Sequence, residues 1–230
     1  MKLTGELMNI SDDTLKVLQN FASVNPNLVL KPGQKVKTIS EAKNIMAIAE
    51  ITEDFPVEFG VYDLNEFLSV HGLIENAAVT FDEKSLTMSN GDQKIKYFFA
   101  ETEILTQPTK DITMPNAEVG VNLSDKVLDQ IKKAASVLGH TELSLKGDNG
   151  VVTASVLDVK DATANTFDIV VDKDNSCKEE FNFVVNIPNL KLLPGDYYVS
   201  ISSKLISNWQ NTNYPVQYFI ALERTSSFGV

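Results

Sequence analysis

Few residues in this chain have the types and spacing that catalysis or metal binding requires. His71 and His140 are its only histidines and stand in different halves of the sequence, and Cys177 is its only cysteine. Zinc sites use about four ligands, mostly nitrogen or sulfur, and nucleophilic catalysis needs a base beside the nucleophile. The phosphate-binding pattern G-x-x-x-x-G-K-[ST] does not occur in the sequence. We therefore predict a protein that is not an enzyme and binds no metal or cofactor, with His71 at a helix end and His140 in a turn.

One polar segment, residues 172–176, opens like a calcium-binding loop, with aspartates at its first and third positions. An EF-hand loop also needs a glycine at position six and a glutamate at position twelve. Cys177 and Phe183 occupy those two positions here. We interpret the segment as a polar loop.

The charge of the chain limits how it can meet nucleic acid. The chain has 20 Lys and Arg against 31 Asp and Glu, a net charge of −11 and a pI near 4.6. Domains that bind nucleic acid usually carry a basic surplus. Arg224 is the only arginine, and arginine is the usual bidentate reader of guanine. Sequence-specific DNA recognition is therefore not expected, and any contact with DNA should be loose and generic.

Four segments have helical spacing of apolar residues. Helices are predicted from Ser11, from Asp63 and from Ser124 to Gly139, because serine and aspartate cap helix starts and glycine ends helices. A short helical turn is predicted at 188–192. The apolar faces consist of Leu15, Leu18, Phe21 and Ala22 in the first helix, Leu64, Phe67 and Leu68 in the second, and Val127, Leu128, Ile131, Ala134, Ala135 and Leu138 in the third.

Short apolar or alternating runs between turn residues predict a protein dominated by strands. Asn90-Gly91 is a typical hairpin signal, and the polar loop 207–213 contains Trp209, to which the sequence assigns no role. The predicted strands are 28–30, 35–39, 45–49, 77–81, 85–88, 94–99, 141–146, 151–159, 166–171, 180–186, 197–202 and 217–222.

The order of these elements indicates two copies of one α+β domain. Each half runs from a strand through a helix and several strands to a strand-to-helix junction and further strands, and equivalent positions lie about half the chain apart. The connector, about residues 100–119, contains Pro108 and Pro115, which favour an extended segment. We predict domains at 1–108 and 109–230.

Five segments together resemble a known family. They are the two strand-to-helix junctions at 54–68 and 180–197, the opening residues 20–22 and 30–34, and the ending 218–223. In order and spacing they resemble the DNA polymerase sliding clamps of T-even-type bacteriophages. The resemblance is scattered over nearly the whole chain, and none of the segments is a chemical motif.

The resemblance implies the DNA-clamp fold, in which two similar domains place antiparallel sheets outside and two helices inside a ring closed by three subunits. It implies a processivity factor in DNA replication that surrounds duplex DNA without sequence preference, and a possible role as a transcription coactivator. An ATP-dependent clamp loader and the C-terminal peptide of the DNA polymerase are the implied protein partners. With no apolar run long enough for a membrane helix and no secretory signal, we expect the protein in the host cell cytoplasm and away from membranes.

Lysines on the polar faces of the predicted helices are the candidate DNA-facing residues: Lys16, Lys126, Lys132, Lys133 and Lys191. The alternative is an ordinary solvated face, stabilised by an Asp129–Lys133 pair at helical spacing. The resemblance favours the first interpretation, because these faces would line the hole. Few phosphate contacts would give a shallow grip that permits sliding.

The resemblance also implies a groove for partner peptides beside the connector and the C-terminal tail. Its candidate residues are Leu105, Pro108, Met114, Pro115 and Phe228. The alternative is plain packing of the connector onto a sheet. For ring closure we expect pairing between the edge strand 94–100 of one subunit and 166–171 of the next.

Two other functions stay open at this point. A structural or capsid-associated phage protein would also be acidic, rich in strands and poor in cysteine. A tandem-domain enzyme with an unrecognised site is the second. The lysine-bearing helices at matching places in the two halves favour the clamp over both.

Overall fold

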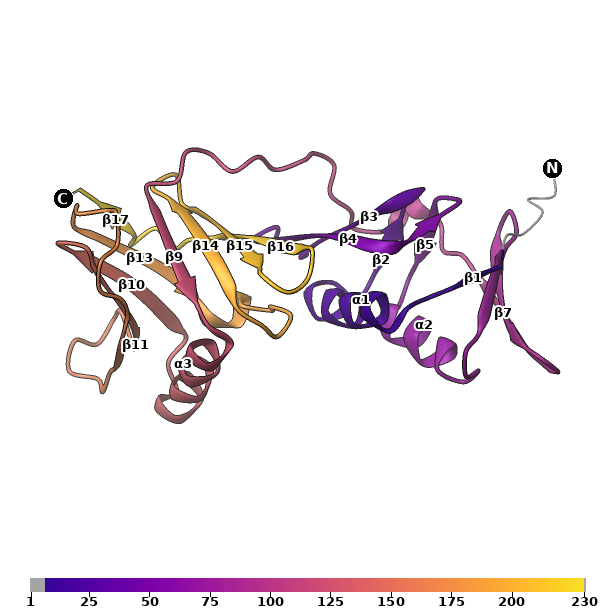
Figure 1. Cartoon of the computed structure of the whole chain (residues 1–230), viewed down its shortest axis with the longest axis horizontal. Helices are drawn as coiled ribbons and strands as arrows, with labels where there is room; N and C mark the ends of the chain where they lie inside the picture. Colours follow the sequence, from indigo (N-terminus) through magenta and orange to yellow (C-terminus); the bar gives the residue numbers. More distant parts are fainter. Residues whose placement is uncertain (1–6, 230) are drawn as a thin grey trace. The chain divides into compact units, whose positions relative to one another are not determined.

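The computed structural model describes residues 7–229 of the chain. The chain divides into two compact units, Met1–Lys110 and Asp111–Val230. Residues 105–118, around this division, contain no helix or strand (Figure 1). This segment lies within the connector predicted at about residues 100–119.

Unit 1 contains two α-helices and eight strands among its described residues. Its elements are β1 (Met8–Asn9), α1 (Asp12–Val24), β2 (Leu28–Leu30), β3 (Gly33–Ile39), β4 (Ile45–Phe55), β5 (Phe59–Val61), α2 (Leu64–His71), β6 (Ala78–Phe81), β7 (Ser85–Asn90), β8 (Gln93–Phe98) and the 3₁₀ turn η1 (Thr102–Ile104). The antiparallel ladders join β1-β6-β7-β8, β2-β5 and β3-β4. The predicted hairpin at Asn90-Gly91 connects β7 and β8.

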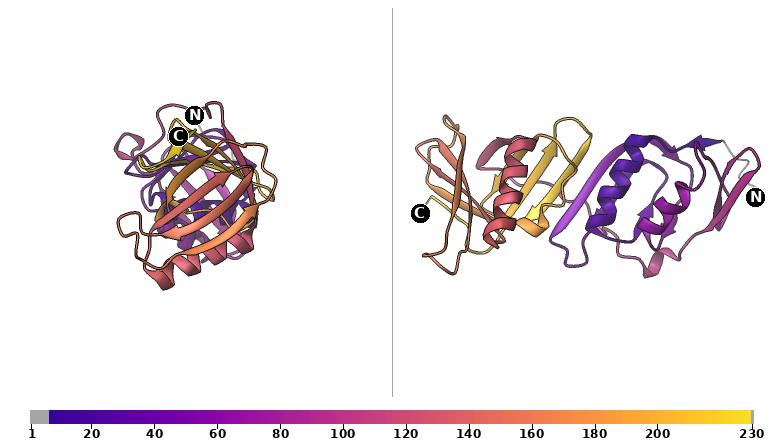
Figure 2. Two further views of the ribbon diagram at one scale, coloured as in Figure 1. Left: turned by 90° about the vertical axis from the view of Figure 1, so that its left-hand side faces the viewer. Right: turned by 90° about the horizontal axis from the view of Figure 1, so that it is seen from below.

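The core of unit 1 is closed by α1, which packs on β4 and on α2 (Figure 2). Beneath it, Phe55, Phe59, Phe81 and Phe99 form an aromatic cluster with ring centroids 4.9–6.2 Å apart. These rings come from three different strands and the segment after β8, so the cluster ties the sheets of unit 1 together.

Unit 2 repeats this order of elements. They are β9 (Val119–Leu123), α3 (Asp125–Leu138), β10 (Glu142–Asp148), β11 (Val151–Leu157), β12 (Phe167–Asp172), β13 (Phe181–Asn186), the 3₁₀ turn η2 (Ile187–Asn189), β14 (Tyr197–Ser202), β15 (Ile206–Asn211), β16 (Val216–Ala221) and β17 (Ser227–Phe228). The antiparallel ladders join β12-β11-β10-β13-β17 and β9-β14-β15-β16. The predicted α+β organisation with two similar halves is confirmed.

The region around Trp209 differs from its prediction as a polar loop. Residues 206–211 form β15, and the Trp209 side chain is fully buried against Tyr197. Its indole Nε1 donates a hydrogen bond of 2.9 Å to the Ser207 hydroxyl, which itself donates to the carbonyl of Ile220. The polar side chains of this segment form hydrogen bonds within unit 2, as Asn208 does with Gln217. A polar sequence therefore does not identify a loop here.

The fourth predicted helix, residues 188–192, is reduced to the single turn η2. Pro188 sits in that turn, and Leu190, Leu192 and Leu193 after it are all buried. The backbone groups of Leu193 bond to tyrosine hydroxyls, accepting from Tyr197 and donating to that of Tyr218, instead of continuing a helix. The expectation of two α-helices per domain is therefore wrong for unit 2, in which residues 111–229 contain one α-helix.

Candidate nucleic-acid and partner interfaces

Helix α1 begins as its sequence predicts. The Ser11 hydroxyl accepts a hydrogen bond of 3.3 Å from the backbone N–H of Thr14, which satisfies one of the unpaired donors at the helix start. The buried side includes Leu18 and Phe21, while Leu15 stays half-exposed. This orientation leaves Lys16 on the exposed side of the helix.

A carboxylate from β4 holds the first turn of α1 in place. Glu53 is only 7% exposed and accepts a 2.6 Å hydrogen bond from the backbone N–H of Ser11 and another from the hydroxyl of Thr14. Burial raises the pKa of Glu53, but the hydrogen bonds from Thr14 and Ser11 outweigh it and hold that pKa below its usual value. The sequence offers no signal for this contact, because its partners lie about forty residues apart.

Helix α3 presents the other candidate lysines. Ser124 caps its start, Gly139 ends it with a left-handed φ of 72°, and Leu128, Ile131 and Ala135 are buried, against β11 and β12. The apolar face predicted for this helix is therefore its buried side, although Val127, Ala134 and Leu138 at its margins are only half-buried.

Three of the candidate lysines, Lys126, Lys132 and Lys133, share the exposed side of α3. Within residues 7–229 none of them forms an ion pair, and the Asp129–Lys133 pair of the solvated-face alternative is not made. Lys191 does not lie on a helix, contrary to the prediction, since the chain leaves η2 at Asn189. It is half-exposed.

The candidate peptide-groove residues are distributed over both units. Leu105 is 6% exposed and packs on β5, where a Cβ added to Gly60 would stand 2.8 Å from its Cδ1 atom. This close packing agrees with the alternative interpretation for that residue. Pro108, Met114 and Pro115 are half-exposed along the connector.

Phe228, the last candidate of that set, lies on β17 at the margin of the β10–β13 sheet. The strand pairs with β13, and the Phe228 ring stacks on Phe183 with 6.2 Å between ring centroids. The C-terminal segment is further attached where the Ser226 hydroxyl accepts from the N–H of Val184 at 2.9 Å. Phe228 remains half-exposed.

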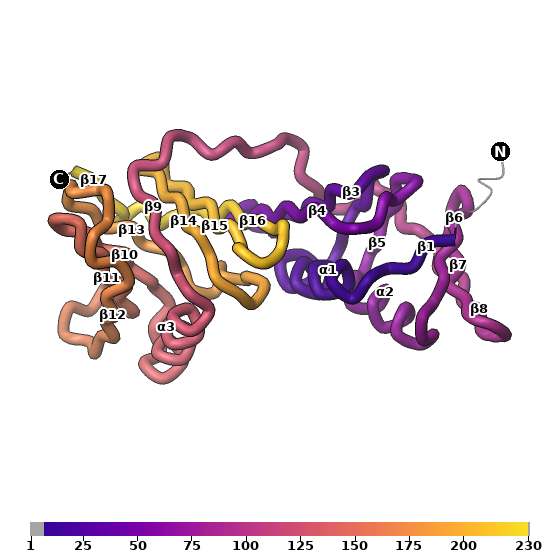
Figure 3. The backbone as a smooth tube through the Cα atoms, viewed as in Figure 1, coloured from indigo at the N-terminus to yellow at the C-terminus, as the bar shows by residue number. Residues whose placement is uncertain are grey.

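Two sheets end in strands that carry exposed charged and apolar side chains. β8 is the last strand of its sheet in unit 1 and β12 the last of its sheet in unit 2 (Figure 3). On β8 the alternating residues Lys94, Lys96 and Phe98 are exposed, and on β12 so are Asp168 and Val170. The apolar members are 68% exposed for Phe98 and 47% for Val170. In the sequence, the alternation of Lys94, Lys96 and Phe98 is the pattern that indicates an exposed face on this strand.

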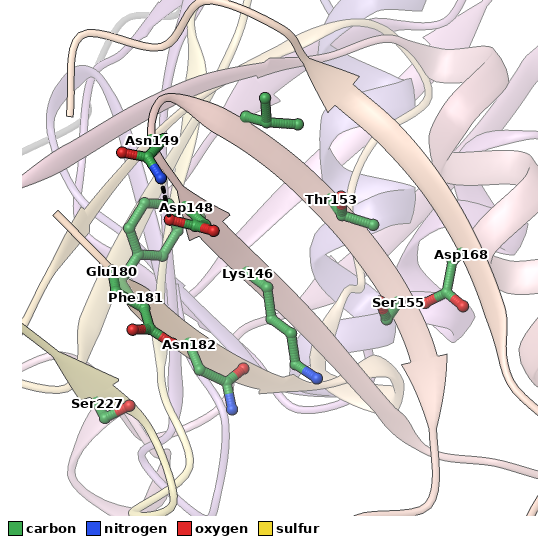
Figure 4. A pocket seen from close by; sticks show the side chains of 12 residues that line it. Lys146, Asp148, Asn149, Thr153, Ser155, Asp168, Glu180, Phe181, Asn182 and Ser227 are labelled. Atoms are coloured by element: carbon green, nitrogen blue, oxygen red, sulfur yellow. Dashed lines mark hydrogen bonds between the residues drawn. The ribbon is translucent and has the colours of Figure 1, made fainter. Parts of the chain in front are cut away.

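A polar depression of about 830 Å³ lies over β10, β11 and β13 (Figure 4). Lys146 and Asn182 extend from neighbouring strands, and the Ser155 hydroxyl donates to the Asp168 carboxylate beside them. The lining holds one lysine and three carboxylates, so the site disfavours phosphate and is not a candidate contact for DNA.

The residues considered for catalysis are separated in the structure. His71 is 9% exposed at the end of α2, beside a depression of about 380 Å³ between α1 and α2, and burial lowers its pKa. The Nε2 atom of His140 lies 2.8 Å from the carbonyl oxygen of Asn165. Cys177 is half-buried. Residues 7–229 contain no group of three or more His, Cys, Asp or Glu side chains placed to hold a metal ion.

The segment 172–176 is held by its own side chains. Asp172 accepts from the backbone N–H of Asp174 at 3.0 Å, and the Asn175 amide donates to Asp172 and to the carbonyl of Gly120. These contacts are those of a polar loop. Among the described helices, none is both long and apolar enough to cross a membrane.

Comparison with known proteins covers both units. A family model described as DNA polymerase processivity factor matches residues 11–105, and one described as the C-terminal part of the gp45 sliding clamp matches residues 120–224. The sliding clamp of Vibrio phage KVP40 is 32% identical over 222 residues, covering 94% of this chain and 99% of that protein. That of Escherichia phage RB69 is 27% identical over 229 residues, covering 96% and 99%.

A solved structure extends the likeness to the fold. PCNA from A. fulgidus, with the C-terminal region of FEN-1 bound, matches with a TM-score of 0.70 at 13% identity, over 99% of this chain and 100% of that chain. The two units and the fold therefore match processivity factors and sliding clamps in each comparison.

Proposed function

The chain belongs to the sliding-clamp family of DNA polymerase processivity factors, and from that membership we propose that three copies close into a ring around duplex DNA and tether the replicative polymerase. The observation that carries the proposal is the match of whole phage sliding clamps to nearly the whole chain. Members of this family are non-catalytic scaffolds, so the chain is not an enzyme. A structural or capsid-associated role is not favoured.

Ring closure is supported by the two free sheet edges. An unpaired edge strand offers a row of backbone donors and acceptors that a second edge can complete. We propose that β8 of one subunit pairs with β12 of the next, which brings the exposed Lys94, Lys96 and Phe98 to the same interface as Asp168 and Val170. Opposite charges and apolar pairs across antiparallel strands each contribute roughly 0.2–1 kcal/mol.

The position of DNA follows from the charge of the chain. A ring of three subunits carries three times −11, but fields of exposed charges fade over about 8–10 Å in physiological salt. Duplex DNA in the hole would therefore respond to the helix lysines, and the acidic exterior would disfavour binding from the side. Retention would come from topology, with little affinity of the free protein for linear duplex.

The partners of the ring are proposed from the family and the surface. The C-terminal peptide of the polymerase would bind beside the connector and the C-terminal tail. The residues proposed to contact it are Pro108, Met114 and Pro115 of the connector and Phe228 of the tail. This location is supported by the half-exposed apolar side chains there. An ATP-dependent clamp loader would open and close the ring. We further propose residues 1–108 and 109–230 as the clamp domains, and the host cell cytoplasm as the site of action.

The test combines mass in solution with retention on DNA. The expected mass is near three times 25.4 kDa, and the loaded ring should remain on closed circular DNA and leave when the circle is cut. Phe98→Asp and Val170→Asp should each shift the mass toward the monomer. Tyr62→Asp, on a side chain that is also 68% exposed but off the edge strands, should leave the trimer intact. A monomeric wild type, or equal retention on linear DNA, contradicts the proposal.

A further inference from the structure

We infer that the electrostatic hold on DNA comes from α3 of unit 2 alone, and that the helices of unit 1 contribute no net attraction. This inference rests on the proposed function and concerns which of the helices grips the duplex. The candidates named from the sequence included Lys16 in unit 1 together with the lysines of unit 2.

The helices of unit 1 carry no unneutralised cation. Lys16 is the single basic residue of α1. Its Nζ lies 3.0 Å from the Asp13 carboxylate. Asp12 adds a second negative charge in the same turn. Helix α2 contains Glu66 and no lysine or arginine, and its cap is Asp63. Phosphates approaching these two helices would therefore meet a net negative surface.

Helix α3 has the opposite character. Lys126, Lys132 and Lys133 are exposed without ion pairs among the described residues. Of the two acidic residues on the helix, Asp125 accepts a hydrogen bond of 2.9 Å from the backbone N–H of Gly195 at the helix start. With Asp129 in the second turn, the helix carries three lysines against two carboxylates, a net positive charge. The side of α3 is therefore basic in a chain that is strongly acidic elsewhere.

The spacing of the lysines fits a phosphate backbone. Lys126 and Lys133 are seven residues apart, which is about two helical turns and about 10 Å along the axis, and both lie on the same side. Lys132 extends the patch along its flank. Because lysine acts as a mobile point charge, these contacts would carry no base information. In a ring of three copies, each copy would contribute one basic helix.

The inference is tested by the diffusion of loaded rings along DNA tethered at both ends, measured as a function of salt concentration. Release of counterions makes the hold depend on salt, with a log–log slope of about 0.9 per phosphate contact. The double variant Lys132→Glu, Lys133→Glu should diffuse faster at low salt and lose a slope of up to about 2 for each α3 in contact with DNA. Lys16→Glu, a single charge reversal in unit 1, should keep the wild-type slope.

A gain-of-charge variant covers the possibility that the double variant fails to load. Val137 is 84% exposed on α3, one turn beyond Lys133. Val137→Lys should slow diffusion at low salt and steepen the salt dependence by about 0.9 per contact, whereas the neutral Val137→Gln should not. Solution mass and helical content identify any variant that has lost its trimer or fold.

Two results overturn the inference without touching the proposed function. The first is a Lys16→Glu ring whose slope falls by about 0.9, the value for one lost phosphate contact. The second is a Val137→Lys ring that diffuses like wild type. If instead wild-type rings are not retained on closed circular DNA at all, the proposed function fails and the helix assignment fails with it.

Discussion

Replacing Glu53 by glutamine tests how α1 is attached to unit 1. The carboxylate of Glu53 is 7% exposed on β4 and accepts from the Ser11 N–H and the Thr14 hydroxyl at the start of the helix. Glutamine keeps the size of the side chain but has no charge and only one accepting oxygen. The Thr14 hydroxyl can turn to accept from the new amide, so both positions remain hydrogen-bonded.

The expected loss is therefore the difference between charged and neutral hydrogen bonds. A hydrogen bond to a charged group contributes roughly 1.5–3 kcal/mol and a neutral one roughly 0.5–1.5 kcal/mol. Two bonds weakened by about 1 kcal/mol each lower the free energy of unfolding by about 2 kcal/mol at neutral pH. Glu50→Gln is the control, because Glu50 lies on the same strand with its side chain 69% exposed, 3.9 Å from Lys35. Its expected effect is below about 1 kcal/mol.

The effect of pH on this contact has a definite sign. The pKa of Glu53 is lowered in the folded chain, so the unfolded chain takes up the proton more readily. The carboxylate thus stabilises the folded state fully above the unfolded pKa of about 4.3 and loses this contribution as pH falls through the folded pKa. The glutamine variant lacks this part of the acid dependence.

The assay is urea unfolding at one fixed protein concentration, followed by circular dichroism at neutral and at acidic pH. Hydrogen exchange of the α1 amides locates the change in unit 1. A Glu53→Gln protein as stable as wild type at neutral pH refutes the reasoning. So does a stability difference that is undiminished at a pH below the folded pKa of Glu53.

Three further predictions concern single buried positions. Burial lowers the pKa of His71 in the folded chain. The contribution of His71 to the free energy of unfolding is therefore complete above the unfolded pKa of about 6.5 and decreases as the pH falls below it. His71→Leu should make the urea midpoint less dependent on pH in that range, and a midpoint that falls as steeply as in wild type would contradict this. Trp209→Phe removes a buried hydrogen bond and leaves a void, and should lower the free energy of unfolding by roughly 2–3 kcal/mol in urea titrations. Gly60→Ala would place its Cβ 2.6 Å from the Ala100 carbonyl oxygen and 2.8 Å from Leu105. It should cost roughly 1–3 kcal/mol, visible as a lower melting temperature, and a neutral result would mean that the segment after β8 moves freely.

The sequence by itself determined the features that depend on neighbouring residues. Ser11, Asp63 and Ser124 cap helices because their side chains reach backbone donors two or three residues away. The hairpin at 90–91 and the extended connector follow in the same way from turn residues and prolines. The absence of a catalytic constellation was also a property of composition and spacing, and the family assignment supports it.

Tertiary structure decided the features whose partners are distant in the chain. Trp209 lies in the core because β14 and β16 pair with its strand. The segment that follows Lys191 leaves the helical path where the backbone N–H of Leu193 bonds to the hydroxyl of Tyr218, 25 residues away. The contact of Glu53 with α1 likewise joins residues about forty positions apart. Local hydrogen bonds are set by residues a few positions apart, whereas burial and charge pairing are set by whatever the fold brings alongside.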